Sequence, residues 1–174
     1  MATKVLSNEF MQNIATEEAW KELSGNFNWS EAMLEKCQDK VDWEEISRNR
    51  LIRWTIPMIQ KFQKKINWDV FSDCAEENIL TESCLDAFKE KWNWHNLSNN
   101  SDVNLTDELL EKYADRWDWE VIIDSYSHDV FNKKAIEFYE KYKEYIPASK
   151  LQNTTLWRNI VEQRAHQLAD EITA

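Results

Sequence analysis

The stretch from Leu105 to Trp119, LTDELLEKYADRWDW, has a spacing of residue types that recurs along almost the whole chain. An apolar residue is followed by Ser or Thr. An apolar pair comes four and five positions on, and mostly aromatic residues stand at positions eight and fourteen. Repeats with this spacing start near residues 6, 29, 54, 80, 105, 131 and 156, at intervals of 23 to 26 residues. Self-similarity at such a period is typical of repeat proteins.

Each repeat contains start signals for two helices. The first helix follows a Ser or Thr, both preferred N-cap residues, and its apolar positions mark one helical face of about twelve residues. These N-caps are Ser30, Thr55, Thr81 and Thr106. A second, shorter helix should begin at the aromatic residue of position fourteen, because an Asp or Asn precedes it. These N-caps are Asp42, Asn67, Asn93 and Asp118.

The composition favours an all-helical protein. Among 174 residues there are ten Trp but one Gly and two Pro, too few for many hairpin turns. We predict an all-α fold, an α-solenoid of about seven tandem helix-turn-helix repeats that form one domain over residues 1–174. Aromatic residues of position fourteen should form a buried spine along the repeats. The spine comprises Trp20, Trp43, Trp68, Trp94 and Trp119.

The last three repeats depart from the pattern. The fifth repeat keeps its first half but loses the Leu-Ser pair that closes earlier repeats. In the sixth we expect Phe131, Tyr139 and Tyr145 at the starting, eighth and fourteenth positions. The seventh is a terminal variant in which Leu156 and Leu168 remain apolar, while Trp157 stands in the capping position.

The repeats with W-N-W-H-N-L-S and W-E-E-I-S, together with L-T-x-x-L-L-E-K-Y-x-x-x-W-D-W, resemble short tryptophan-rich helical repeats of uncharacterised bacterial and large-virus proteins. The resemblance covers roughly residues 6 to 155 and is strongest over repeats four and five. It implies the repeat architecture and a binding role. It brings no catalytic residue to this sequence.

The net charge and the termini limit the possible partners and location. A net charge of −11 disfavours nucleic acid and anionic membranes, whose phosphates attract Lys and Arg. We therefore expect a protein partner with a basic surface. The start, MATKVLSNEF, has no apolar segment of a secretion signal, and no run of eighteen apolar residues occurs. These features predict a cytoplasmic protein that neither spans nor binds a membrane.

Catalytic and metal-binding patterns are missing from the sequence. The three histidines fall at unrelated repeat positions, and His95 is interpreted as a surface residue; the others are His128 and His166. Cys37, Cys74 and Cys84 lack metal-ligand spacing and are interpreted as reduced core residues. We expect no catalytic site, no cofactor and no metal.

Charge is distributed unevenly, and this gives the candidate binding residues. Residues 48–68 carry six cations and no acid: Arg48, Arg50, Arg53, Lys61, Lys64 and Lys65. Repeat five is rich in acids, of which Asp107, Glu111 and Asp115 have the spacing of one helical stripe. The candidate acidic surface comprises Asp107, Glu108, Glu111 and Asp115. Both sets are also consistent with ordinary solvated helix faces.

Three functions remain open from the sequence. The favoured one is a non-enzymatic, protein-binding helical repeat protein that acts as an adaptor or inhibitor. The alternative is an acidic mimic of nucleic acid, such as a phage anti-defence or toxin-immunity protein, that blocks a basic site on a target enzyme. The least favoured is an enzyme whose site is assembled from carboxylates of different repeats.

Overall fold

The computed structural model describes residues 8–125, 129–132 and 134–173, and the regular secondary structure of these residues is helical. These residues form twelve α-helices and one 3-10 helix, which confirms the predicted all-α fold of stacked helical repeats. The chain divides into two compact units, Met1–Lys91 (unit 1) and Trp92–Ala174 (unit 2). The helices of unit 1 are α1 (Glu9–Asn26), α2 (Glu31–Cys37), α3 (Trp43–Arg48), α4 (Ile56–Phe62), α5 (Trp68–Cys74) and α6 (Glu82–Ala87). Those of unit 2 are α7 (Trp94–Asn99), α8 (Asp107–Lys112), α9 (Trp119–Asp124), η1 (Asp129–Phe131), α10 (Ala135–Tyr142), α11 (Ala148–Leu151) and α12 (Thr155–Thr173).

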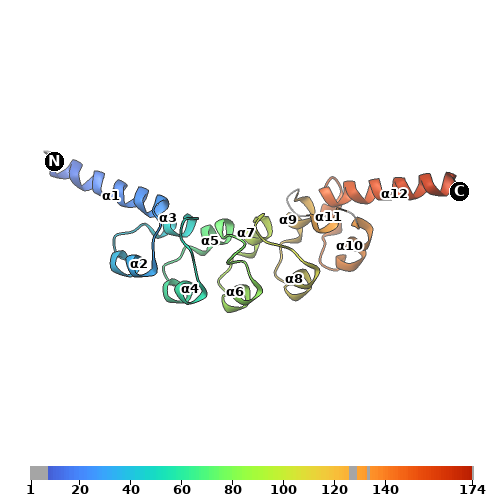
Figure 1. The fold of residues 1–174 in the computed structure, drawn as a ribbon. Helices are drawn as coiled ribbons and strands as arrows, with labels where there is room; N and C mark the ends of the chain where they lie inside the picture. Colours follow the sequence, from blue (N-terminus) through green and yellow to red (C-terminus); the bar gives the residue numbers. More distant parts are fainter. Residues whose placement is uncertain (1–7, 126–128, 133, 174) are drawn as a thin grey trace. The chain divides into compact units, whose positions relative to one another are not determined.

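Within each unit the helices fall into two rows, one for the first and one for the second helix of each repeat. In unit 1, α3 packs against α1 and α5 packs against α3, while α2, α4 and α6 lie on the other side of the ribbon (Figure 1). In unit 2, α7 packs against α9, and α12 contacts both α9 and α10. Stacking of neighbouring repeats therefore buries the apolar stripes that no short helix can bury alone.

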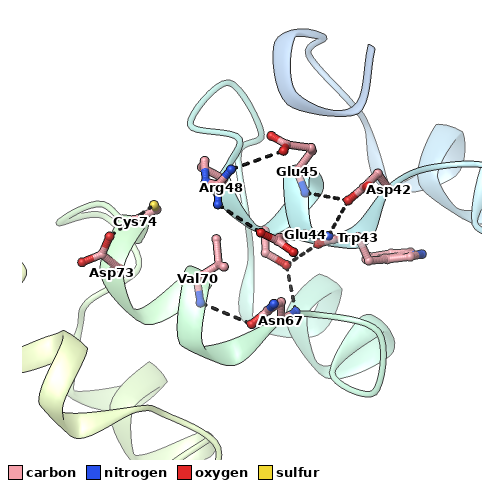
Figure 2. Close-up of polar contacts among 10 residues, drawn as sticks. Asp42, Trp43, Glu44, Glu45, Arg48, Asn67, Val70, Asp73 and Cys74 are labelled. Atoms are coloured by element: carbon pink, nitrogen blue, oxygen red, sulfur yellow. Dashed lines mark hydrogen bonds and ion pairs between the residues drawn. The ribbon is translucent and has the colours of Figure 1, made fainter. Parts of the chain in front are cut away.

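Both sets of predicted N-caps are present. In the first helices, Ser30 Oγ accepts a hydrogen bond from Met33 N–H at 3.4 Å, and Thr106 Oγ1 accepts one from Leu109 N–H at 3.2 Å. In the second helices, Asp42 Oδ1 accepts from the N–H groups of Glu44 and Glu45 (Figure 2). These bonds satisfy amides that the first helical turn leaves without a partner.

The first helices are shorter than the predicted twelve residues. They contain seven residues in α2 and six in α8. Continuation of α2 would require Asp42 N–H to donate to the Gln38 carbonyl. That carbonyl instead accepts the Trp43 indole N–H at 2.9 Å. The Asp42 N–H donates to Ser24 Oγ in the preceding repeat, also at 2.9 Å. These two contacts therefore replace a bond that a helix of the predicted length requires.

A buried serine links the second helices of successive repeats. Ser47 Oγ donates to the Trp43 carbonyl at 2.6 Å and accepts from the backbone N–H of Asn67, in the next repeat, at 2.9 Å. Ser24 and Ser98 make the same two bonds with their own neighbours. Each of these hydroxyls thus joins two repeats through hydrogen bonds shielded from water. We call this arrangement the serine link.

A buried asparagine adds a second connection in unit 1. Asn49 donates through Nδ2 to the carbonyls of Ser24 and Phe27, at 2.7 and 2.8 Å, and its Oδ1 accepts from Leu51 N–H. Its side chain is buried, and so is that of Asn100 at the same position of repeat four. Asn49 therefore stabilises the stacking, in addition to forming the predicted turn.

The predicted tryptophan spine is more deeply buried in unit 2 than in unit 1. Trp94 and Trp119 are buried, whereas Trp43 and Trp68 are half-buried. Trp20 is half-buried as well. Trp20 stacks on Trp29, with ring centroids 6.4 Å apart. The other four spine tryptophans pack against an aromatic residue at the end of the first helix of the next repeat, in the pairs Trp43–Phe62 (5.3 Å), Trp68–Phe88 (5.4 Å), Trp94–Tyr113 (4.9 Å) and Trp119–Tyr142 (5.0 Å).

Repeat one differs from the prediction of two helices. It is a single continuous helix, α1, of 18 residues, capped by Asn8. The residue before Trp20 is Ala19, so no Asp or Asn is present to start a second helix at the tryptophan. The predicted start of this repeat, at Leu6 and Ser7, lies outside the described residues.

Repeat six has a different register from the predicted one. The buried face of its first helix is formed by Phe138 and Tyr142, followed by buried Ile146, while Tyr145 is 47% exposed. Tyr139, predicted to occupy the eighth position, is only half-buried. The second helix begins at Ala148 with Pro147 as its N-cap, not at Tyr145. The buried residues recur at intervals of four, the spacing that keeps side chains on one helical face.

The end of repeat five lacks the serine link, because both the linking serine and the residue that donates to it are replaced. Ile123 stands where earlier repeats have the linking serine and is fully buried. Pro147 stands where those repeats have the donating Asp or Asn. Because proline has no backbone N–H, this joint needs no acceptor. An apolar side chain can therefore replace the hydroxyl without leaving a buried donor unpaired.

Repeat seven consists of the single helix α12. Thr154 Oγ1 accepts from the Trp157 N–H at 3.2 Å, so the cap lies three residues before the predicted capping position. Leu156 is fully buried as expected, whereas Leu168 is 43% exposed.

Candidate functional site

A histidine–aspartate pair lies between the second helices of repeats four and five. His95, the second residue of α7, places Nδ1 2.7 Å from Asp118 Oδ2. The other oxygen of Asp118 accepts the N–H groups of Glu120 and Val121, at 3.0 and 3.3 Å, as the N-cap of α9. One carboxylate therefore caps a helix and holds an imidazole from the preceding repeat. The His95 side chain remains 65% exposed.

Two adjoining hollows border this pair. One, of about 460 Å³, is lined by the pair and by Glu120, Tyr145 and Pro147 among others. The other, of about 360 Å³, shares His95, Asp118 and Glu120 and extends to Asp124. Together they form what we call the His95 groove, defined by His95, Asp118, Glu120, Asp124, Tyr145 and Pro147. Three of these six residues are acidic.

An aromatic ledge forms one wall of the groove. The Tyr145 ring stacks on Trp119 with centroids 5.6 Å apart and planes 19° apart. Trp119 is buried, and its indole N–H donates to the Ala114 carbonyl at 2.8 Å. Tyr145 covers Trp119, lines the groove and is itself 47% exposed, so part of its ring remains open to solvent.

The predicted basic residues lie in unit 1, and several are paired with acids. Arg48 lies 3.2 Å from both Glu44 and Glu45 of its own helix (Figure 2). Lys65 lies 3.5 Å from Asp39. Arg50 lines a narrow hollow beside Cys74. Arg53 and Lys64 are exposed, and within the described part of the chain neither has an ion pair. The six cations therefore do not act as one unneutralised basic surface.

Lys61 forms a clamp between two repeats. Its Nζ lies 2.9 Å from both Glu31 and Glu35, which are one turn apart on the preceding first helix. Hydrogen bonds to Glu31 and Glu35 raise the pKa of Lys61. The cation thus forms ion pairs with two acids of the neighbouring repeat.

The predicted acidic surface contains the equivalent clamp. Lys141 of α10 places Nζ 3.2 Å from Asp107 and 2.7 Å from Glu111. The hydrogen bond to Glu111 is the main reason that the pKa of Lys141 is raised. Asp115 is not on the same helical stripe, because α8 ends at Lys112; it lies 3.8 Å from Arg116.

Glu108, the remaining acidic candidate, is exposed. The concentration of acids that suggested a recognition surface is thus partly explained by repeat stacking.

The cysteines fit the predicted role of reduced core residues best at Cys84. All three are free thiols; Cys84 is buried, while Cys37 and Cys74 are half-buried. Burial raises the pKa of Cys84 to about 11. Burial, with the charge of Asp73 as a second cause, also raises the pKa of Cys74. Because the thiolate is the reactive form, these environments disfavour nucleophilic chemistry at both residues.

Some functional features were not predicted from the sequence, and others lie beyond the structure. The serine link was not predicted, although Ser follows four of the spine tryptophans by four positions. The pairing of His95 with Asp118 and the exposed ledge of Tyr145 have no signal in a single sequence. His166 is exposed on α12, and His128 lies outside the described residues.

The described parts of the structure contain neither a group of metal ligands nor a membrane-spanning helix. Over residues 8–125, 129–132 and 134–173, no three His, Cys, Asp or Glu side chains are grouped to hold a metal ion. None of the helices formed by these residues has both the length and the apolar character needed to cross a membrane.

Comparisons of the chain with protein-family models, curated proteins and solved structures gave no match. The resemblance to tryptophan-rich repeats therefore stays a prediction.

Proposed function

We propose that this chain is a non-enzymatic repeat protein that binds another protein as an adaptor or inhibitor. The supporting observation is that recurring residues make the contacts between repeats, whereas an exposed position beside them varies. The recurring residues, the spine tryptophan and the serine four positions later, face the neighbouring repeats. The residue directly after the tryptophan is exposed and changes chemically from repeat to repeat. This outward series is Lys21, Glu44, Asp69, His95 and Glu120.

This variation is what a binding surface on a constant scaffold requires. Repeat arrays use recurring residues for stacking and leave the outer positions of one surface to recognise partners. The N-cap of the second helix in the next repeat matches the charge of the outward residue. The cap is Asp42 in the repeat after Lys21 and Asp118 in the repeat after His95, but Asn67 in the repeat after Glu44. The matching avoids a carboxylate beside a carboxylate, so these outer side chains can vary while the cap is kept.

Quantitative capture from cells of origin tests the proposal. The full chain would be compared with a triple variant of the outward surface, His95→Ala, Glu120→Gln and Asp124→Asn. A control of similar charge change, Glu137→Gln with Glu140→Gln, alters α10 away from the His95 groove. We expect a stoichiometric protein partner that the control retains and the triple variant loses.

Absence of any partner above background would contradict a binding function. Retention of the partner by the triple variant would place binding on another surface. Titration of the purified partner at increasing salt would then test the acidic-mimic alternative, which requires steep salt dependence.

A further inference from the structure

The place occupied by Tyr145 holds a cation in the repeats of unit 1. Lys65 occupies this position in repeat three, three residues after the aromatic residue that packs on the spine tryptophan. Its Nζ lies 5.8 Å from the centroid of the Trp43 ring and 3.5 Å from Asp39 Oδ1. Lys40 lies above Trp20 in the same manner, at 5.6 Å. The spine tryptophan is thus a cation site that these repeats fill with their own lysine, and in repeat three a carboxylate completes it.

Repeat six keeps the surroundings of this site but not the cation. Tyr145 replaces the lysine and extends the aromatic surface of Trp119 towards solvent. Asp115 stands four residues before Trp119, as Asp39 does before Trp43. Asp118, Glu120 and Asp124 add carboxylates along the groove.

Two cations of this chain also lie near the groove. Arg116 lines it and lies 3.8 Å from Asp115. Lys150 lies 3.2 Å from Glu120, with both side chains more than half exposed. Exposed pairs of this kind contribute little to stability, so a better-placed cation can displace Lys150.

The shape of the site favours a planar cation. A guanidinium lies flat on an aromatic ring and can direct its fork of N–H donors to a carboxylate at the same time. An ammonium group lacks the planar surface, although it also interacts with an aromatic ring. The exposed part of the Tyr145 ring, in the same hollow as Glu120 and Asp118, offers both contacts.

We propose that the His95 groove binds an arginine side chain of a protein partner, with the guanidinium stacked on Tyr145 and paired with Glu120 or Asp118. This inference rests on the proposed protein-binding function and specifies the chemistry that the partner must present. Three carboxylates line the groove, against the guanidinium of Arg116 and the ammonium group of Lys150 that is paired with Glu120, and this negative balance gives the charge complementarity.

The test is an NMR titration of the full ¹⁵N-labelled chain with the peptide acetyl-GSGRGSG-amide. Two matched peptides carry lysine or the neutral isostere citrulline in place of arginine. We expect the arginine peptide to shift the Trp119 indole N–H and the backbone amides of Tyr145 and Glu120. Binding of the lysine peptide should be about two- to fivefold weaker, and the citrulline peptide should leave these signals in place.

Three variants link the shifts to the groove. Tyr145→Lys restores the residue type found at this position in repeat three; the introduced cation should cover Trp119 and abolish peptide binding while the thermal midpoint is kept. Tyr145→Phe should bind as the native chain does, because the ring face and not the hydroxyl is used. Glu120→Gln should weaken binding, whereas Glu144→Gln, an exposed control with the same charge change, should not.

Equal shifts with arginine and citrulline, or unchanged binding by the Tyr145→Lys variant, would overturn the inference. Absence of peptide-induced shifts at peptide concentrations on the order of 10 mM would also overturn it, because one stacked ion pair should be detectable at this level. If the cellular partner is still captured by Tyr145→Lys, the binding function stands and only the arginine site fails. If no partner is captured at all, the proposed function fails.

Discussion

The joint between repeats two and three and the joint between repeats five and six contain the same contacts with two replacements. In both, a spine tryptophan packs on an aromatic residue of the next repeat, and a lysine clamps two acids one turn apart. The first joint has Ser47 bonded to the Asn67 N–H, where the second has Ile123 and Pro147. The first has Lys65 over its tryptophan, where the second has Tyr145.

The comparison separates what stacking requires from what it permits. A buried hydroxyl is needed only where the next repeat offers a backbone N–H, and the two disappear together. The tryptophan needs a cover, but the cover can be an ammonium group or a ring. Trp119 is buried under a ring, whereas Trp43 under a lysine stays half-buried.

The largest expected effect is loss of the buried tryptophan. Trp119→Ala should lower the free energy of unfolding by about 3–5 kcal/mol, because it removes a buried indole and leaves a cavity. Trp43→Ala should cost less, since part of its surface already contacts water. Chemical denaturation of both variants measures the difference. Equal losses would mean that the difference in burial between the two joints has no energetic consequence.

The serine link should come next in size. Ser47→Ala leaves the Asn67 N–H without its acceptor in a buried position, at a cost of about 1–3 kcal/mol. Ser83→Ala, at an exposed serine of α6, is the control and should cost less. Urea denaturation compares the two. A loss at Ser47 no larger than at Ser83 would show that the link contributes nothing.

Transplanting the second joint into the first sharpens the comparison. Ser47→Ile and Asn67→Pro should each destabilise the protein alone, because one leaves a donor unpaired and the other removes the donor and the side-chain cap. Made together they should cost less than their sum, with a coupling of about 0.5–3 kcal/mol. A double-mutant cycle in urea measures this coupling, and strict additivity would argue against matched replacement.

The lysine clamps should have the smallest effect. Lys141→Ala should cost less than about 1 kcal/mol, because the pair is largely exposed, and the loss should shrink at high salt. The raised pKa of Lys141 gives the sign of the pH dependence. The contribution of the clamp to stability is complete below the pKa of lysine in the unfolded chain, near 10.4, and declines as pH rises through the raised pKa of the folded state. Thermal midpoints at pH 7 and above pH 10 follow this decline, with Lys64→Ala as the unpaired control. A salt-independent loss would assign the effect to packing of the lysine stem.

Particular residues show how far the sequence predicts this fold. The caps at Thr106 and Asp118 and the burial of Trp119 follow from local preferences and repeat spacing, and all are present. The predicted length of the first helix was wrong: the Gln38 carbonyl and the Asp42 N–H, which a longer α2 would pair, bond to Trp43 and to Ser24 of another repeat, and no local preference reports such contacts. Repeat six shifted register because Pro147 and Tyr142 together redefine the buried face. The His95 groove depends on side chains that meet only after stacking, so spacing alone could not predict it.

Hydrogen exchange of single amides tests the serine link most directly. The backbone N–H groups of Asp42, Asn67 and Asp118 all precede a helix, where amides usually exchange quickly. Each donates to a serine hydroxyl of the preceding repeat at 2.9 Å. They should therefore exchange as slowly as the helical amides of Ile46 and Ile122. In the Ser47→Ala variant, the amide of Asn67 should exchange faster, either alone or before the other two amides. Exchange of these three amides as fast as that of exposed Thr55 in the native chain would contradict the account of how the repeats are joined.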